Sequence, residues 1–142
     1  MNLARVAAAA VVAWIVSIGI GFFVNAVLLE GLFMANAAAF RQEAEMMAKL
    51  PLGFGLMLVG FFAFAYAYAK GYEGGSGVGE GLRFGLLVGV MLACFAMIWT
   101  FVTTPISGAL GAAFLVDAVV EFSIYGAIVG AIYKPAGSGK GA

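Results

Sequence analysis

The stretch LRFGLLVGVMLACFAMIWTFV, residues 82–102, decides the class of fold. Its only charged residue is Arg83, and a helix of about 20 apolar residues is long enough to cross the hydrocarbon core of a bilayer. Three other stretches have similar length and polarity, which places transmembrane helices over residues 6–32, 51–69, 82–102 and 107–133. The sequence therefore predicts an all-α integral membrane protein, folded as a single four-helix antiparallel bundle.

Composition agrees with a membrane protein and narrows the functions open to it. Of the 142 residues, 65% are hydrophobic and 10% are charged, with a mean hydropathy of +1.11; soluble domains have about 25% charged residues. Seven basic residues balance seven acidic ones, which argues against nucleic-acid binding. There is no histidine, so His-ligated haem, most catalytic zinc sites and Ser–His catalysis are excluded. We expect no cofactor and no enzymatic activity.

The segment ANAAAFRQEAEMMAKLP, residues 35–51, has the pattern of an amphipathic helix. Two interpretations are open: a short helix lying on the outer membrane surface, or a helical extension of the second span. We expect the separate surface helix, with Asn36 as its N-cap and Pro51 in the first turn of the next span. One face carries four apolar residues and another carries three charged ones: Ala37, Phe40, Ala44 and Met47, then Arg41, Glu45 and Lys49.

The other connections are rich in glycine and proline. KGYEGGSGVGEG, residues 70–81, predicts a flexible surface loop, and TTPISG, residues 103–108, predicts a tight turn. Residues 134–142 read as a flexible tail. Basic residues predict the orientation, since they gather on the cytoplasmic side of membrane proteins. Both termini are then cytoplasmic, because five basic residues fall on that side and two on the other: Arg5, Lys70, Arg83, Lys134 and Lys140 against Arg41 and Lys49.

Small residues recur every fourth position on two of the spans, where they allow the backbones of neighbouring helices to approach closely. Gly81, Gly85 and Gly89 form one such row, and Gly126 and Gly130 form the other. These rows either pack against each other within the chain or join the chain to another copy or to another membrane subunit.

The stretch FLVDAVVEFSIYG, residues 114–126, places two acids inside the fourth span. Asp117, Glu121 and Tyr125 follow one another at i,i+4 and so share one helix face. An acid at the centre of a span costs about 2.5–3.5 kcal/mol. No Lys or Arg lies at matching depth, so we expect at least one of the two carboxyls to be protonated at neutral pH. Asn25 and Thr100 are the candidate polar neighbours from other spans.

Three interpretations of these acids remain open: a proton or cation site, a hydrogen bond between helices or subunits, and a local hydrogen bond from Asp117 to Asn25 or a threonine. Met91, Cys94 and Met97 are a second candidate, because sulfur ligands suit Cu(I). Methionine and cysteine are also ordinary apolar residues, and we expect no metal.

Three segments together resemble a group of small, uncharacterised bacterial proteins with four transmembrane helices: FRQEAEMM (40–47), YAKGYEGGSGVGEGLRFG (68–85) and VVEFSIYGAIVGAIYKP (119–135). The resemblance implies four helices in a bacterial inner membrane and implies no activity. Small size and short loops favour a non-catalytic accessory or structural subunit, whose partners are the lipid bilayer and other membrane subunits or itself. The alternative is a small proton- or cation-coupled transporter or channel that uses Asp117 and Glu121.

Overall fold

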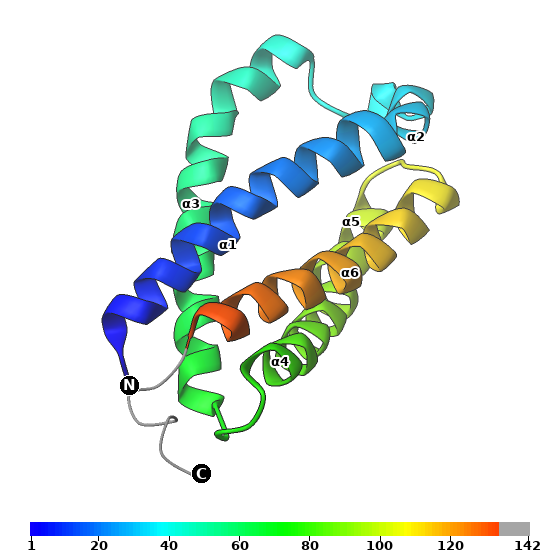
Figure 1. The fold of residues 1–142 in the computed structure, drawn as a ribbon. Coiled ribbons are helices and arrows are strands. Elements are labelled where there is room, and N and C mark those ends of the chain that lie inside the picture. Colours follow the sequence, from blue (N-terminus) through cyan, green and yellow to red (C-terminus); the bar gives the residue numbers. More distant parts are fainter. Residues whose placement is uncertain (134–142) are drawn as a thin grey trace.

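A computed structural model describes residues 1–133, and this part of the chain is helical throughout apart from short connections (Figure 1). It contains four helices that are long and apolar enough to cross a membrane, which confirms the predicted number of apolar helices. Their bounds are Leu3–Leu28, Glu43–Gly71, Gly77–Thr103 and Gly108–Ile132. The predicted tail, with Lys134 and Lys140, lies outside the described residues.

The helices are α1 (Leu3–Phe23), α2 (Glu30–Ala35), α3 (Glu43–Gly71), α4 (Gly77–Leu92), α5 (Ile98–Thr103) and α6 (Gly108–Ile132). Two π-helical turns, Val24–Leu28 and Ala93–Met97, extend α1 and join α4 to α5, and a short 3₁₀ turn covers Ala37–Ala39. Three helices begin at a capping side chain whose oxygen accepts a backbone N–H of the first turn. These caps are Asn2 for α1, Ser76 for α4 and Ser107 for α6.

The first span differs from its predicted bounds of 6–32. It begins three residues earlier, at Leu3, and its continuous helix ends at Leu28. Near this end the Asn25 side chain donates to the carbonyl of Gly21 at 2.7 Å, and the Leu29 N–H reaches back five residues to Val24 O at 2.8 Å. The polar side chain competes for a carbonyl of its own helix, and the helix widens into a π turn there.

The prediction of a separate amphipathic helix is wrong. The helix begins at Glu43 and continues unbroken through Pro51 as α3, so the segment is a helical extension of the second span. Proline within a helix is tolerated in membrane proteins, where neighbouring groups compensate for the lost hydrogen bond. Asn36 does not cap this helix; its side chain instead accepts from the Ser107 N–H at 2.7 Å and donates to Ser107 Oγ at 3.2 Å.

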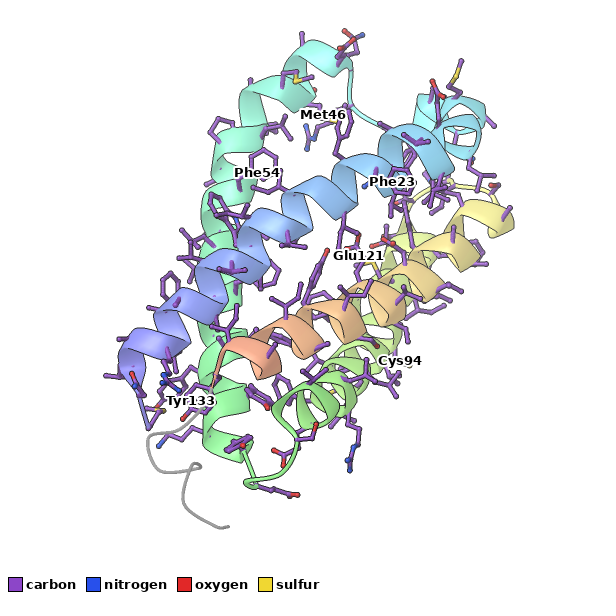
Figure 2. The ribbon with its side chains drawn as sticks, viewed as in Figure 1. Phe23, Met46, Phe54, Cys94, Glu121 and Tyr133 are labelled. Atoms are coloured by element: carbon purple, nitrogen blue, oxygen red, sulfur yellow. The ribbon has the colours of Figure 1, made fainter. Side chains whose placement is uncertain are left out.

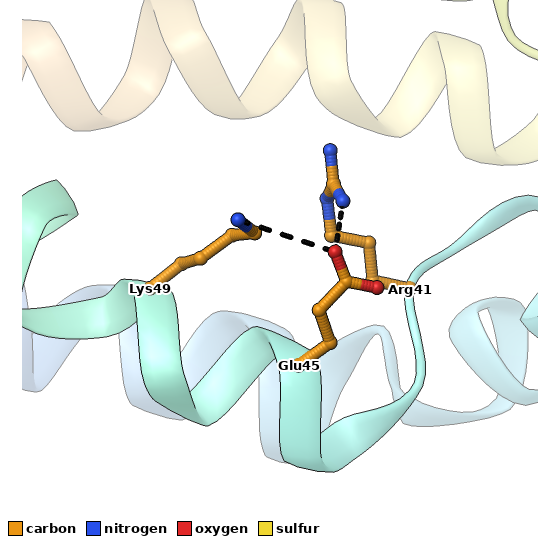
Figure 3. Close-up of polar contacts among 3 residues, drawn as sticks. All are labelled: Arg41, Glu45 and Lys49. Carbon is orange, nitrogen blue, oxygen red and sulfur yellow. Dashed lines mark hydrogen bonds and ion pairs between the residues drawn. The ribbon is translucent and has the colours of Figure 1, made fainter.

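The charged face expected in this segment is present at the start of α3 (Figure 3). Glu45 pairs with Arg41 one turn before it, and the Lys49 ammonium lies 4.0 Å from the same carboxylate oxygen. All three side chains are at least half exposed. An exposed pair of this kind contributes about 0–1 kcal/mol, so the cluster adds little to the stability of the fold.

The glycine-rich segment 70–81 is also more ordered than predicted, since α3 ends at Gly71 and α4 begins at Gly77. The Glu80 side chain accepts from the backbone N–H groups of Glu73, at 3.1 Å, and Gly75. Gly74 has φ +92°, a conformation that glycine adopts without strain. The connection is therefore a short turn held by a carboxylate from the helix that follows it.

The α4 and α6 helices form the most extensive helix–helix contact in the structure. Along this contact Gly81 lies against Gly126 and Gly130, and Gly89 lies against Ala118 and Val119, so the two helices run in opposite directions. α1 packs against both α3 and α6. Figure 1 shows the N-terminus, the end of α3 and the end of α6 at one end of the molecule.

Aromatic side chains fill the core at that end. Phe61 and Tyr125 make an edge-on contact with ring centres 5.2 Å apart, and Phe64 reaches Phe84 of α4 at 5.0 Å. Small side chains of α1, namely Ala9, Ala10 and Ala13, are fully buried against this cluster. Large rings on α3 thus occupy the space that small residues leave on α1.

Candidate functional site

The fourth span carries the polar row predicted from the sequence, and the structure places its members differently. Glu121 Oε2 accepts a hydrogen bond from the Tyr125 hydroxyl at 2.7 Å. Tyr125 is only 3% exposed, and the Glu121 Oε1 atom is buried with no hydrogen-bond partner within residues 1–133. Asp117, one turn earlier, is half-buried and makes no hydrogen bond in the same part of the chain. Glu121, rather than Asp117, is the centre of the site.

Glu121 lies on a groove of about 630 Å³ between α1, α3 and α6. In Figure 2 its side chain lies between the α1 and α6 ribbons, while Phe54 and Met46 mark the α3 side. The polar side chains on the groove are Ser17, Asn25, Glu121 and Tyr125, and apolar residues supply the rest of the lining. This volume is within the range of about 300–1,000 Å³ that is common for small-molecule sites.

The expected polar cluster of Asp117, Asn25 and Thr100 does not assemble. Asn25 faces the Glu121 groove, but its amide nitrogen bonds Gly21 O of its own helix. Thr100 donates to Ala96 O at 3.3 Å, also within its own helical segment. Asp117 does not line the groove. Hydroxyl and amide side chains in apolar helices commonly donate a hydrogen bond to a carbonyl of the preceding turn. Asn25 and Thr100 do so, and neither hydrogen-bonds a side chain of another helix in the described residues.

Sequence reasoning missed the contribution of α3 to the groove. Met46, Leu50, Phe54, Met57 and Phe61 line it, at spacings of four, four, three and four residues. This spacing is an apolar stripe along one helix face, so the signal was present in the sequence. The stripe was not recognised because the second span was predicted to begin at Pro51, so Met46 and Leu50 were assigned to a different helix.

Next to this groove, the Trp14 side chain joins α1 to α3 by a hydrogen bond that the sequence did not predict. The Trp14 indole N–H donates to the carbonyl of Phe54 at 3.0 Å. The Ser17 hydroxyl, 5% exposed, donates to Trp14 O at 2.7 Å. The two bonds fix one wall of the groove.

The two predicted glycine rows come together in the structure. A Cβ atom added to Gly81 or Gly85 would overlap a backbone carbonyl of α6, and one added to Gly126 or Gly130 would overlap the backbone of α4. The rows are therefore occupied by a contact within the chain, and neither is free to join subunits.

A different set of small residues faces outward, on α3. In the described part of the chain, no atom lies within 4 Å of the position that a Cβ would take at Gly53 or Gly60. Gly60, Ala63 and Ala67 border a second, wholly apolar groove of about 440 Å³ between α3 and α4. Phe84 of α4, which lines this groove, also contacts Tyr68 of α3, with ring centres 5.6 Å apart.

The sulfur residues do not lie in either groove. Met91 and Cys94 are exposed, and Met97 is half-buried within the π turn Ala93–Met97. Within residues 1–133, no group of three or more His, Cys, Asp and Glu side chains is placed to hold a metal ion.

Comparisons of the chain with protein-family models, with curated proteins and with solved structures find no match.

Proposed function

We propose that this chain is a non-catalytic subunit of a membrane assembly, and that a transmembrane helix of a second copy or of another subunit packs on α3. The observation that carries the proposal is the open face of α3. Gly53, Gly60 and Ala67 recur at seven-residue intervals on one side of the helix, and Gly60 and Ala67 border an apolar groove between α3 and α4. A small-residue face lets another helix approach closely in lipid, where packing rather than water drives association.

The proposed arrangement in the membrane is an antiparallel four-helix bundle in a bacterial inner membrane, with both termini in the cytoplasm. The basic residues support this orientation, since Arg5, Lys70 and Arg83 fall near one set of helix ends and Arg41 and Lys49 near the other. A reporter fused after Ala142 tests it directly. Cytoplasmic alkaline phosphatase would be inactive there, so strong phosphatase activity would contradict the orientation.

Two leucine variants test the proposed packing on α3. Gly60→Leu places a large side chain on the open face, while Gly55→Leu makes the same change at another open position, about 140° round the helix. Native mass spectrometry of protein purified in mild detergent should show a larger assembly for the parent and for Gly55→Leu, and a single chain for Gly60→Leu. A parent that is a lone chain, or an assembly that Gly60→Leu leaves intact, would contradict the proposal.

Cross-linking then identifies the neighbour. In a Cys94→Ala background, Ala67→Cys places a single thiol at the apolar groove between α3 and α4. A disulfide-linked dimer under mild oxidation indicates a second copy, and a cross-link to a different membrane protein indicates another subunit. The absence of either product from an assembly of the expected mass would place the contact on another face.

A second candidate function is proton- or cation-coupled transport through Glu121. The specific observation in its favour is the buried, unpaired Glu121 Oε1 atom on the 630 Å³ groove, because intramembrane acids commonly mark ion paths. Proteoliposomes containing the parent should then show a cation-dependent proton flux that Glu121→Gln abolishes and Glu30→Gln, a control outside the groove, retains. No flux in the parent would remove this candidate and leave the assembly proposal untouched.

A further inference from the structure

The Glu121 groove has a chemical polarity that indicates what would bind in it. Most hydrogen-bond donors of its lining side chains already have an acceptor inside the protein, and the exception is the second N–H of the Asn25 amide. The Tyr125 hydroxyl donates to Glu121, the Ser17 hydroxyl to Trp14 O and the Asn25 amide nitrogen to Gly21 O. Among the residues that the structure describes, none of those lining the groove is Lys or Arg. The side chains therefore offer mainly acceptors to a bound molecule, and the strongest of these is the Glu121 carboxylate.

The rest of the groove is apolar and partly aromatic. Aromatic residues from three helices line it: Phe22 of α1, Phe54 and Phe61 of α3, and Phe122 of α6. Two methionines of α3, Met46 and Met57, complete this apolar lining. Such walls favour a hydrophobic body, and aromatic faces also attract cations. A carboxylate, phosphate or sulfate group would meet an acid and no basic side chain among the described lining residues, so an anionic ligand is disfavoured on charge alone.

We propose that the groove between α1, α3 and α6 binds a small amphipathic amine, whose protonated nitrogen bonds the Glu121 carboxylate and whose apolar body lies among Phe54, Phe61 and Phe122. The ammonium supplies a positively charged donor to this carboxylate, and a charge-assisted bond is stronger than a neutral one. The amine is a free solute rather than a lipid headgroup, because Glu121 is the fourteenth of 25 residues in α6 and so lies near the middle of the span.

This inference gives a ligand to the second candidate function, but it requires neither transport nor assembly. Binding without flux would keep the site and remove transport. Gly60→Leu, which alters only the α3–α4 side, should bind amine as the parent does, so a failure of the assembly proposal is distinguishable from a failure of this one.

The test compares three probes that share one body: naphthylethylamine, naphthylethanol and naphthylacetate. Each is titrated by equilibrium dialysis against the full chain in phosphatidylcholine nanodiscs, with empty nanodiscs to correct for partition into lipid. The amine should bind saturably, one molecule per chain, and at least tenfold more tightly than the alcohol, while the carboxylate should not bind. Equal retention of all three probes, or no saturable amine binding, would overturn the proposal.

Two variants localise the bound amine. Glu121→Gln keeps the shape of the side chain and removes its charge, and should lower amine affinity at least tenfold, whereas Glu30→Gln should change it less than twofold. Gly21→Leu adds a side chain to the groove wall at a position where a Cβ meets only Asn25 Nδ2, at 4.0 Å. It keeps the carboxyl and should also weaken binding, which provides a second reading if the Gln variant does not fold. Unchanged affinity in folded Glu121→Gln, or in Gly21→Leu, would contradict the assignment.

Discussion

The α4–α6 pair and the α3 helix use glycine in opposite ways. At the pair, the absence of a side chain allows two backbones to touch, as Gly85 does against Phe122 and Gly126. On α3, Gly53, Gly55 and Gly60 have no atom of residues 1–133 within 4 Å of the missing Cβ. The same residue type therefore marks a completed contact in one region and an open surface in the other.

The difference separates glycines that pack within the chain from glycines that are open to another chain. The α4–α6 contact joins neighbouring spans linked by the four-residue turn between Thr103 and Gly108, so its glycines are satisfied within one molecule. α3 approaches α4 mainly through aromatic rings at one end, and the small residues further along border an apolar groove. Substitutions at the two sets of glycines should separate stability from association.

The largest effect is expected for Gly85→Leu. The new side chain would overlap the carbonyl of Phe122, a backbone group that cannot rotate away. Overpacking costs about 1–3 kcal/mol where side chains can adjust, and we expect the upper end of that range or loss of folding here. Thermal unfolding in detergent, followed by tryptophan fluorescence, measures the effect. An apparent Tm equal to that of the parent would show that the α4–α6 contact is not as close as described.

A graded alanine series sharpens the same comparison. A Cβ on Gly85 would overlap Phe122 O, one on Gly89 would lie 2.8 Å from Ala118 O, and one on Gly60 would meet nothing. In a detergent that keeps the protein as single chains, the loss of stability should fall in that order, and Gly60→Ala should raise stability by up to about 1 kcal/mol through helix propensity. The apparent Tm of the three variants checks the order. A destabilised Gly60→Ala in single chains would contradict the open α3 face.

Sequence reasoning located the four apolar helices because hydropathy over about 20 residues is a local property. It also selected Gly81, Gly85, Gly126 and Gly130, since small residues at four-residue spacing form one face whatever their partner. The partner itself depends on how the helices cross, and the sequence left open whether the rows join within or between molecules. The outward small residues of α3 escaped notice because their seven-residue spacing is interrupted by large aromatic side chains.

The polar site was predictable only in part. Asp117, Glu121 and Tyr125 were identified from i,i+4 spacing, which fixes neighbours on one helix but says nothing about the groove opposite. Asn25 and Thr100 were assigned to the site by depth alone, whereas each has a carbonyl available four residues earlier in its own helix. The extension of α3 before Pro51 then added Met46 and Leu50, which no depth argument included.

A smaller effect is expected from Asn36→Ala, which tests a contact outside both glycine sets. The Asn36 side chain joins the connection after α2 to the start of α6 through two hydrogen bonds to Ser107. Their loss should cost about 1 kcal/mol and increase amide exchange over residues 104–111. Hydrogen-exchange mass spectrometry measures this. Asn25→Ala is the control, since Asn25 bonds only its own helix, and equal exchange in the two variants would contradict a bridging role for Asn36.

The smallest effect is expected from Tyr125→Phe, which separates the ring from the hydroxyl. The ring packs edge-on against Phe61 and Phe122 and should stay in place, while the 2.7 Å hydrogen bond to Glu121 Oε2 is lost. Side-chain hydrogen bonds between transmembrane residues average about 0.6 kcal/mol, so the apparent Tm should fall only slightly. The carboxyl, however, would then have both oxygens without a partner within residues 1–133.

If Glu121 recognises an amine, the Tyr125→Phe variant should still bind naphthylethylamine, because the carboxylate that accepts from the nitrogen is retained. Tyr72→Phe, which removes an exposed hydroxyl bonded to Gly75 O, controls for the loss of a phenol. A fall in Tm as large as that of Gly85→Ala would mean that the Glu121–Tyr125 pair, and not the glycine contact, dominates the stability of α6.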